Sequence, residues 1–562
     1  MLEEIVEIVA LDPEREVPFD RDEILEDPLE VLDICSSLVS TTTVSAKESD
    51  EGSDEEYSDR HNTTAQAVVL AHYSVQEYLT SQRCTNGQAS QYAMDEAVCH
   101  TLISESCLSS LLYSFSKENR EDIGKLTLSD YSARFWISHA EKGQKNARWT
   151  RSTATFCSDS SALTQWIRIY DPDELFNGDG EMIPTESVLQ GLYFISFTGF
   201  VEVAVQLIER YNHQVNAQGG TCGNALQAAS SVGREGLIEL LLSKGADVNA
   251  QGGLYGNALQ AASNGGYLEI VELLLSKGAD VNAQGGLYGN ALQAALERGH
   301  QEVVELLLSK GADVNARGGF YGNALQAASE SGHDGLVEML LSKGIDVNAK
   351  GGHYGNALQA ASHGGHEGLV EVLLSKGADV NARGGFYDNA LQAASASARG
   401  HETIVKLLIS KGADVNARGG FYGNALQAAS VRGHKTIVRL LVSKGADVNA
   451  RGGFYDNVLQ AASHGGHERL VEMLLSKGVD VNAQGGHYGN ALQAASHEGH
   501  KTIVEMLISR GADVNAHGRN YGNALQAASA SGHKTIVELL ISKGCQRARW
   551  RILQQRAAGR VE

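Results

Sequence analysis

Histidine recurs at one position of a repeated pattern, and imidazole is a common zinc ligand and proton carrier. The repeated histidines are His300, His333, His366, His401, His434, His467, His500 and His533. Their spacing is 33 residues, with one step of 35. Packed helices lie about 10 Å apart, whereas a zinc–nitrogen bond is about 2.1 Å long. We therefore expect structural hydrogen bonds from these side chains and no metal site.

Two other patterns look superficially like ligand-binding motifs. Three Gly-His-Lys-Thr segments begin at Gly433, Gly499 and Gly532, but they lack the adjacent Gly-Lys pair and the preceding strand of a nucleotide-binding loop. The acidic segment 171–179 fails the calcium-loop spacing, because Leu175 occupies the fifth position. No nucleophile and base set stands out. The sequence therefore predicts no catalytic residue, no cofactor and no enzyme.

A third pattern has the composition of a binding surface. Tyrosine recurs at 255, 288, 321, 354, 387, 422, 455, 488 and 521, and basic residues precede the central tyrosines by four positions. Aromatic residues and arginine are enriched at interface hot spots. One interpretation is a partner-binding strip, which comprises Arg317, Phe320, Tyr321, Lys350, Tyr354, Arg383, Phe386, Tyr387, Arg418, Phe421, Tyr422, Arg451, Phe454 and Tyr455. The other is that the tyrosines pack on one another and the basic residues are simply solvated.

These residues belong to one repeated unit. The motif Asn-(Ala/Val)-Leu-Gln-Ala-Ala occurs ten times, first at Asn224 and last at Asn523. We expect the asparagine to cap a short inner helix that ends at a Gly-His step. An outer helix with apolar residues at helical spacing follows, and then an extended finger rich in glycine. Such a unit buries its apolar faces only by stacking on its neighbours.

The period and the motif Gly-His-x-x-(Ile/Val)-Val-Glu-Leu-Leu-Leu-x-x-Gly-Ala-Asp-Val-Asn-Ala resemble the ankyrin repeat. The resemblance implies a mostly α-helical solenoid over residues 186–544, with about eleven repeats. Residues 186–217 would form a degenerate capping repeat before the ten regular ones. The usual Thr-Pro-Leu-His is replaced by Asn-Ala-Leu-Gln. A two-residue expansion at 395–400 falls in a turn, and a basic tail follows at 545–562.

The region before the repeats contains two further segments. Residues 1–83 read as a winged-helix-like segment, with short strands at 38–44 and 68–71 and an acidic disordered loop at 45–64. Residues 84–185 read as a helical linker region. The segments 28–39 and 70–79, and the helix around Tyr131–His139, are similar to fungal NACHT–ankyrin proteins, which are NLR-like signalling ATPases. The chain has no Walker A motif, so the resemblance extends only to the part without the NACHT ATPase domain.

Charge and cysteine usage limit the partners. Residues 1–185 carry 14 basic and 35 acidic residues, and the remaining residues carry 32 and 33. This acidic balance disfavours nucleic acids and membrane surfaces as binding partners. Seven cysteines without a CxxC pair fit a reducing compartment, so we expect a cytoplasmic protein, with the nucleus left open. An acidic N-terminus argues against a signal peptide.

The sequence thus predicts a non-enzymatic scaffold that binds a protein ligand and no small-molecule substrate. By resemblance, it would be the ligand-sensing portion of a fungal NLR-like protein. The alternative is a regulatory subunit or truncated gene product that acts with a separate NACHT P-loop ATPase. Nucleic-acid binding through an aromatic and basic strip is a third, less favoured hypothesis.

Overall fold

The structure is a computed structural model that describes residues 39–45, 64–70, 95–114, 128–170, 191–211, 213–518 and 520–545. The chain divides into two compact units, Met1–Ala258 and Leu259–Glu562. Among the described residues, no helix has the length and apolar character needed to cross a bilayer.

The first described elements are two antiparallel strands, β1 (Val39–Ser45) and β2 (Thr64–Leu70), with Val39 paired to Leu70. The predicted strand pair is therefore present, although the second strand begins four residues before its predicted start at residue 68. The rest of the predicted winged-helix-like segment, including the interior of the acidic loop at 45–64, lies outside the described residues. The winged-helix-like segment remains a prediction.

Four helices follow in the predicted linker region: α5 (Glu96–Ser114), α6 (Leu128–Lys142), α7 (Ala147–Ser158) and α8 (Ser160–Ile169). Tryptophan side chains form their core. Trp136 and Trp166 meet edge to face at 5.8 Å, and both are at most 1% exposed. The indole N–H of Trp166 donates to the Ala133 carbonyl, and that of Trp149 donates to Ser104 Oγ. Because both indole N–H groups are hydrogen-bonded, burying the two tryptophan rings leaves no polar group unsatisfied.

Eleven successive helix pairs follow in the described residues, from α9 to α30. In the first unit they are α9 (Gly191–Thr198) with α10 (Val201–Glu209), and α11 (Ala225–Ser231) with α12 (Glu235–Ser243). The two-residue strands β3 (Gln218–Gly219) and β4 (Gly223–Asn224) form a small hairpin between these pairs. The pair α9 and α10 lies where the sequence predicted a degenerate capping repeat.

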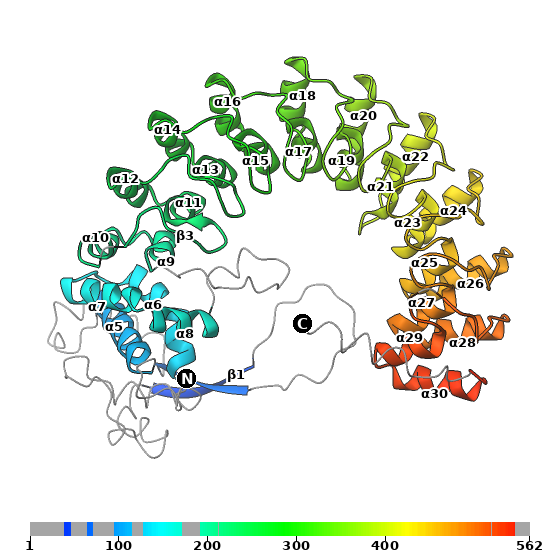
Figure 1. Cartoon of the computed structure of the whole chain (residues 1–562), viewed down its shortest axis with the longest axis horizontal. Coiled ribbons are helices and arrows are strands. Elements are labelled where there is room, and N and C mark those ends of the chain that lie inside the picture. Colours follow the sequence, from blue (N-terminus) through cyan, green and yellow to red (C-terminus); the bar gives the residue numbers. More distant parts are fainter. Residues whose placement is uncertain are drawn as a thin grey trace. The chain divides into compact units, whose positions relative to one another are not determined.

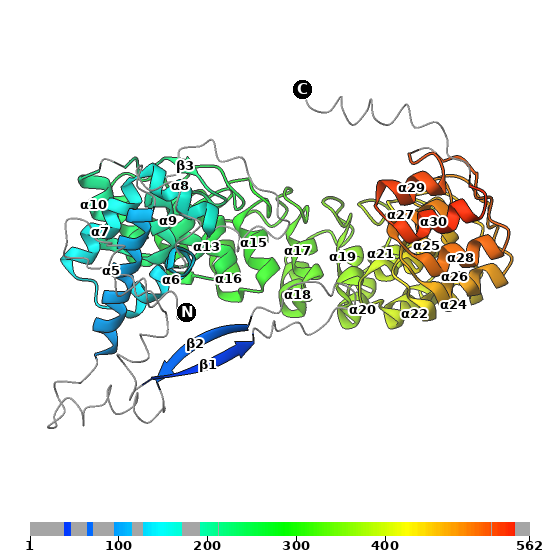
Figure 2. The same ribbon diagram turned by 90° about the horizontal axis from the view of Figure 1, so that it is seen from below.

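The second unit is a row of helix pairs (Figure 1). Its inner helices are α13 (Ala258–Gly265), α15 (Ala291–Arg298), α17 (Ala324–Glu330), α19 (Ala357–Gly364), α21 (Ala390–Ala396), α23 (Ala425–Val431), α25 (Val458–His464), α27 (Ala491–Glu498) and α29 (Ala524–Ala530). Its outer helices are α14 (Leu268–Ser276), α16 (Gln301–Ser309), α18 (Asp334–Ser342), α20 (Glu367–Ser375), α22 (Glu402–Ser410), α24 (Lys435–Ser443), α26 (Glu468–Ser476), α28 (Lys501–Ser509) and α30 (Lys534–Ser542). Figure 2 shows the pairs α17/α18 and α19/α20 side by side along this row.

Local chemistry explains the two layers. Asn290 has extended backbone and its side chain accepts a hydrogen bond from the Gln293 amide, so it caps α15 as predicted. Gly299 ends the same helix with a φ of +78°, a conformation that favours glycine. In the inner helix Ala294 and Ala295 are fully buried, which lets neighbouring inner helices approach closely. Val304 and Leu307 of the outer helix are also fully buried.

The glutamine of the repeated motif ties most inner helices to the following finger, although Gln326 Nε2 of α17 has no hydrogen-bond partner within the described residues. Gln359 Nε2 donates to the carbonyl oxygens of Ala382 and Asp388, at 3.3 and 3.2 Å. Gln427 makes the same pair of contacts with Ala450 and Asp456. Both glutamines are fully buried. The Asp388 and Asp456 oxygens also accept from the amides of Gly384 and Gly452. Among the described residues, the Ala382 and Ala450 oxygens have no other donor, so the glutamine amide satisfies them.

The repeated histidines are structural, as the sequence predicted. The Nε2 atom of each lies 2.7–3.1 Å from a main-chain carbonyl oxygen of the preceding repeat. Since a carbonyl oxygen only accepts, Nε2 carries the proton in this contact. His366, for example, lies 2.7 Å from the Glu330 oxygen. The two-residue expansion leaves this contact intact, because it lies between the end of α21 and the start of α22.

Asparagines in the loops after the outer helices form a second bridge between repeats. Asn416 Nδ2 donates to the Gly445 oxygen at 3.0 Å, and its Oδ1 accepts from the Asp447 amide at 2.8 Å. No such bridge joins Asn449 to the next repeat within the described residues. There Val479 replaces the alanine that follows the loop glycine, and its amide lies 3.5 Å from the Leu474 oxygen, against 3.0 Å for Ala446 and Leu441. The larger side chain displaces the turn.

We predict that Asn416→Ala weakens the local structure by about 1 kcal/mol, because two hydrogen bonds at the surface are lost. Asn449→Ala is the matched control, since Asn449 makes no such bridge. Amide hydrogen exchange of the full chain measures both, with the Asp447 amide as the reporter of the lost bond. Equal acceleration of exchange around residues 447 and 480 in the two variants would contradict this account.

We also predict that Gln427→Leu destabilises the attachment of the finger at 451–456 by about 1–3 kcal/mol, because the buried Ala450 carbonyl oxygen loses its donor. The exposed finger residue Gln484 supplies the control, and Gln484→Leu should change stability little. Hydrogen exchange of the finger amides and urea unfolding measure the effect. A Gln427→Leu variant as stable as Gln484→Leu would show that the buried amide does not anchor the finger.

Candidate partner-binding surface

Each finger is a tight hairpin, and the fingers from 317–322 to 484–489 each hydrogen-bond to the finger before them. In the finger 317–322, Gly318 bridges to Gly322, and the Phe320 amide donates to the Leu287 oxygen at 2.7 Å. The same bond joins His353 to Phe320 at 2.7 Å, and it continues through Phe386, Phe421 and Phe454 to His487. The main chain therefore fixes the spacing of the side chains that the fingers carry.

Two rows of stacked rings run along the fingers. The fingertip row consists of Phe320, His353, Phe386, Phe421, Phe454 and His487, whose successive centroids lie 4.5–5.0 Å apart. The tyrosine row includes Tyr288, Tyr321, Tyr354, Tyr387 and Tyr422, at 6.1–6.5 Å. Stacking at these distances stabilises finger against finger.

The tyrosines of the predicted strip lie inside this packing. Tyr321, Tyr354, Tyr387, Tyr422 and Tyr455 are only 5–8% exposed. Burial raises the pKa of Tyr387 and Tyr455 to about 12, and it raises the pKa of Tyr321 and Tyr354 further. The packing interpretation therefore describes these tyrosines, and their rings offer little area to a partner.

The fingertip row is more accessible than the tyrosine row. Phe320 is 39% exposed, and Leu287, the equivalent residue of the preceding finger, is 42% exposed. Phe386, Phe421 and Phe454 are half-buried. The phenylalanines of the predicted strip, with His353 between Phe320 and Phe386, thus form a partly exposed aromatic edge at the tips of the fingers.

The basic residues of the strip are exposed, but several have carboxylate partners. Arg383 and Arg451 pair with Asp388 and Asp456 of their own fingers, at 3.0 and 2.6 Å. These aspartates stand where other fingers have a glycine, and their φ values of +70° and +65° are rare for a residue with a side chain. The two members of each pair are five positions apart, and the hairpin of the finger brings them together.

The remaining cations of the strip differ in their surroundings. Arg418 lies 3.4 Å from Asp447 of the next loop, and both side chains are about half exposed. Among the described residues, Lys350 forms no ion pair. Arg317 is not free either, because its side chain or main chain has an interaction partner. The sequence suggested a run of positive charge, whereas three of its arginines face a carboxylate.

A second set of side chains lies at the ends of the inner helices, where its polar members contact the tyrosine row, and the sequence interpretation missed it. These residues occupy the seventh position after the capping asparagine, and we call them the variable row: Glu297, Glu330, His363, Ala396, Val431, His464 and His497. The His363 ring lies 5.4 Å from Tyr354 and 5.1 Å from Tyr387. The same contact joins His464 to Tyr455 and Tyr488.

Glu330 is the centre of one cluster in this row. Tyr354 Oη donates to Glu330 Oε1 at 3.1 Å, and His363 Nδ1 lies 3.6 Å from the same oxygen. The interaction with His363 lowers the pKa of Glu330 despite its partial burial. Glu297, one repeat earlier, has a raised pKa because it is desolvated. The cluster keeps a carboxylate that is one quarter exposed beside aromatic rings.

Glu498 is the centre of a second cluster. Its Oε1 lies 2.6 Å from His497 Nδ1, 3.2 Å from His464 Nδ1 and 3.2 Å from Tyr488 Oη. Burial opposes its ionisation, but the hydrogen bond from His497 and the nearby imidazoles outweigh this effect, so the pKa of Glu498 is lowered. Burial lowers the pKa of His464. Within the described ranges, no group of three or more His, Cys, Asp or Glu side chains is arranged to hold a metal ion.

The signal that could have revealed the variable row is the contrast between copies. The motif around it is nearly constant, with Ala-Ala-Ser before it in most copies, while the seventh position changes among acidic, imidazole and apolar residues. The sequence alone does not show that the end of the inner helix lies beside the tyrosines, so the variation could not be assigned to a surface. Side chains that vary on a constant scaffold are the natural carriers of specificity.

Comparisons with known proteins agree with this architecture. A family model for ankyrin repeats (three copies) matches residues 192–285, 259–351, 357–452 and 458–549. A protein of Monascus ruber named azaphilone pigments biosynthesis cluster protein L is 31% identical to this chain over 262 residues. The similar region is 44% of this chain and 52% of that protein, so the chain spans about half the length of the curated relative it matches. Because the family matches cover more than half of the residues, the chain belongs to the ankyrin-repeat family.

Proposed function

We propose that this chain is a non-enzymatic scaffold that binds a protein partner through the fingertip row and the variable row. One observation carries the proposal. The side chains that differ most between nearly identical repeats, such as Glu330, His363 and Val431, lie at the ends of the inner helices, and the polar ones contact the tyrosine row. A surface that combines half-exposed rings with partly desolvated polar groups matches the composition of protein interfaces.

Charge compensation favours a protein over a nucleic acid. Binding to a phosphate backbone depends on cations that replace counterions. In the strip, Arg383 and Arg451 are paired with aspartates of their own fingers, and Arg418 faces Asp447. These carboxylates would repel phosphates at the positions where a nucleic acid needs attraction. Mixed charges suit a folded protein or a peptide with charges of both signs.

The proposed biological setting rests on resemblance. Residues 28–39, 70–79 and 131–139 are similar to the winged-helix region of fungal NACHT–ankyrin proteins. We therefore propose a cytoplasmic ligand-sensing portion of an NLR-like signalling protein. Residues 186–544 would bind the protein ligand, and residues 1–83 would relay the signal. Residues 84–185 would connect these two parts of the chain. A regulatory subunit that acts with a separately encoded NACHT ATPase is the alternative, and co-purification of such an ATPase would favour it.

We predict that the triple change Glu330→Gln, His363→Gln and His464→Gln lowers the capture of specific partners at least about tenfold, which corresponds to roughly 1.4 kcal/mol. Glutamine keeps the size and hydrogen-bonding capacity of these side chains but removes their charge and ring contacts. The measurement is quantitative mass spectrometry of proteins captured from a nuclease-treated cell extract by the full chain, followed by titration of each purified partner.

The control is the triple change Glu338→Gln, Glu371→Gln and Glu472→Gln on the outer helices, where all three residues are exposed. This variant should retain the partners of the unmodified chain. The proposal fails if the two variants capture the same set of proteins in the same amounts. It also fails if the outer-helix variant loses the partners while the variable-row variant keeps them.

A further inference from the structure

The outer helices carry a charge pattern that is interrupted in two neighbouring repeats. Their fifth residue is an exposed glutamate in eight of the ten outer helices from α12 to α30, for example Glu371 in α20. In α22 and α24 the same position holds Lys406 and Arg439, which are also exposed. The charge is therefore reversed on two helices whose other features closely follow the repeat.

Further cations surround these two residues. Lys435 begins α24 and lies four residues before Arg439, so both belong to one face of this helix. Lys411 and Lys444 directly follow the last residues of α22 and α24, and both are exposed. The two helices are in contact and lie side by side in the outer row (Figures 1 and 2). Together with Lys406, five cations share the surface of two adjacent helices.

Few acids oppose this charge. Glu402 pairs with Lys406 at 2.6 Å, and α24 itself contains no acidic residue. In the loops that follow the two helices, Asp414 and Asp447 each accept a hydrogen bond from an asparagine amide of the same loop, and Asp447 also faces Arg418. An equivalent aspartate follows most outer helices, so these loops do not distinguish the two repeats. Four cations form no ion pair among the described residues: Lys411, Lys435, Arg439 and Lys444.

Helix stability does not account for this arrangement. The dipole of a helix favours an acid in its first turn. Five of the ten outer helices from α12 to α30 begin with Glu or Asp, whereas α24 begins with Lys435. Like charges four residues apart, such as Lys435 and Arg439, repel each other. Such departures from the choices that favour folding are expected where a surface serves binding.

An apolar hollow adjoins the cations. Its volume is about 490 Å³, and it lies between α20, the loop after α20, and α22. Its lining includes the half-buried side chains of Leu374, Val380 and Leu407. Lys411 lines it from the end of α22, and Glu371 lines it from α20. An aliphatic side chain can therefore be buried directly beside an ammonium group.

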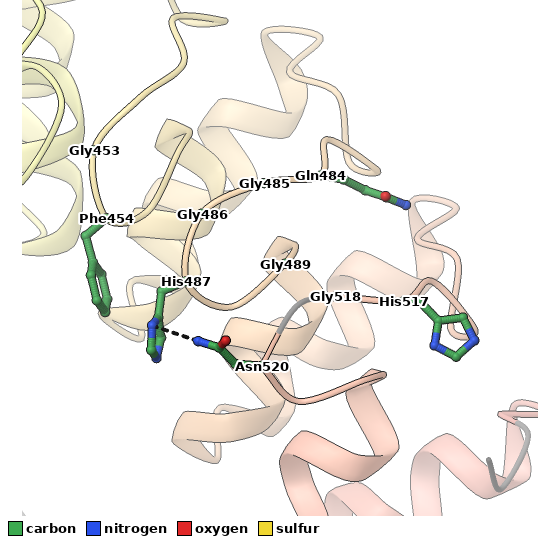
Figure 3. Close-up of a pocket in the computed structure, with 10 residues that line it drawn as sticks. All are labelled: Gly453, Phe454, Gln484, Gly485, Gly486, His487, Gly489, His517, Gly518 and Asn520. Atoms are coloured by element: carbon green, nitrogen blue, oxygen red, sulfur yellow. Dashed lines mark hydrogen bonds between the residues drawn. The ribbon is translucent and has the colours of Figure 1, made fainter. Parts of the chain in front are cut away.

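A larger hollow at the last fingers has a different character (Figure 3). Its volume is about 860 Å³, and much of its lining is glycine main chain. Asn520 Nδ2 donates to His487 Nδ1 at 3.0 Å, so these two polar side chains already pair with each other (Figure 3). Neither lysine nor arginine is among the described residues that line it. Of these two hollows, the one beside α22 combines an apolar lining with a strong charge.

We propose that α22 and α24 bind an acidic segment of a protein partner that also carries an aliphatic side chain. The carboxylates of the partner would face Lys406, Lys411 and Arg439, and the aliphatic side chain would enter the hollow between α20 and α22. Charge complementarity selects the acidic segment, and burial of the aliphatic group adds affinity. This surface lies on helices other than those of the fingertip row and the variable row. The inference rests on the proposed function only in that the ligand is a protein.

A nucleic acid fits this surface less well. Single-strand binding sites combine cations with aromatic side chains on which the bases stack. The helices α20, α22 and α24 contain no aromatic residue. A phosphate backbone carries a charge at every nucleotide, and Glu371 and Glu402 on the same surface would repel it. A peptide can place its acids opposite the cations and its apolar residue beside Glu371.

The test uses the full chain and a fluorescein-labelled peptide, Gly-Glu-Asp-Leu-Glu-Asp-Leu-Glu-Asp-Gly-amide. Fluorescence anisotropy should show saturable binding that weakens as the salt concentration rises. The double change Lys406→Glu and Arg439→Glu installs the residue of the other repeats, so the fold should persist, and it should weaken binding at least about tenfold. The matched control is Lys277→Glu with Lys310→Glu at the ends of α14 and α16. It changes the net charge equally and should bind the peptide as the unmodified chain does.

Two further arms identify the ligand. Replacement of both peptide leucines by glycine keeps the charge but removes the aliphatic groups, and it should weaken binding at least about fivefold. A fluorescein-labelled oligonucleotide of thymidines should bind more weakly than the peptide. Tighter binding of the oligonucleotide, lost through the double change on α22 and α24, would assign the surface to nucleic acid and overturn the proposal. Absence of peptide binding, equal binding by the two double variants, or undiminished binding of the glycine peptide would overturn it as well.

The outcomes for this surface and for the proposed function are separate. The variant with Glu330→Gln, His363→Gln and His464→Gln should bind the acidic peptide as the unmodified chain does. The outer-helix control that includes Glu371→Gln should bind it at least as tightly, because it removes an acid from the hollow. A chain that fails to bind the peptide but loses its captured partners through the variable-row changes would retain the scaffold function without this surface. The reverse result would retain this surface without the proposed one.

Discussion

The architecture depends on a buried amide that crosses from one repeat to the next. Gln359, Gln427 and Gln493 each donate from an inner helix to carbonyl oxygens at the base of the following finger. Without these donors, the buried carbonyls of Ala382, Ala450 and Ala516 would lose their hydrogen bond, at a cost of about 1–3 kcal/mol each. The amide therefore sets the distance between the helix layer and the fingers. The capping asparagine three residues earlier orients the helix that carries it, so one short motif positions both layers.

The fingers convert this regular spacing into a surface. Because fingertip amides bond directly to carbonyl oxygens of the preceding finger, there is no room for a Cβ at the second glycine, as Gly420 and Gly486 show. The sixth finger residue is aspartate in two fingers, where it keeps the left-handed backbone that glycine has in the others. Asp388 and Asp456 then reach back to the arginine at the start of the same finger. The two fingers in which aspartate adopts the left-handed backbone are therefore the two in which the arginine charge is neutralised within the finger.

Much of this architecture follows from the sequence, because its causes are local. The 33-residue period, the capping asparagine, the glycine that ends each helix and the structural role of the histidines are consequences of nearby residues. The tyrosines could not be placed in this way. Their rings are equally suited to an interface and to packing, and only the distance between neighbouring fingers decides between the two. The Arg383–Asp388 pair likewise depends on a hairpin that brings residues five apart together. The variable row depends on helix register.

The separation of anchoring from surface residues explains how nearly identical repeats can carry information. The anchors, the glutamine amide, the histidine and the capping asparagine, bond to main-chain atoms, which every repeat supplies whatever its side chains are. In a linear array each repeat contacts only its neighbours, so a substitution acts locally. The last finger illustrates the consequence: Gln493 still holds its base, while the ring stack of the fingertip row stops at His487 because Asn520 occupies the next position. A surface can therefore change at the tip or in the variable row without loss of the scaffold, provided that the substituted residue is not one of the anchors.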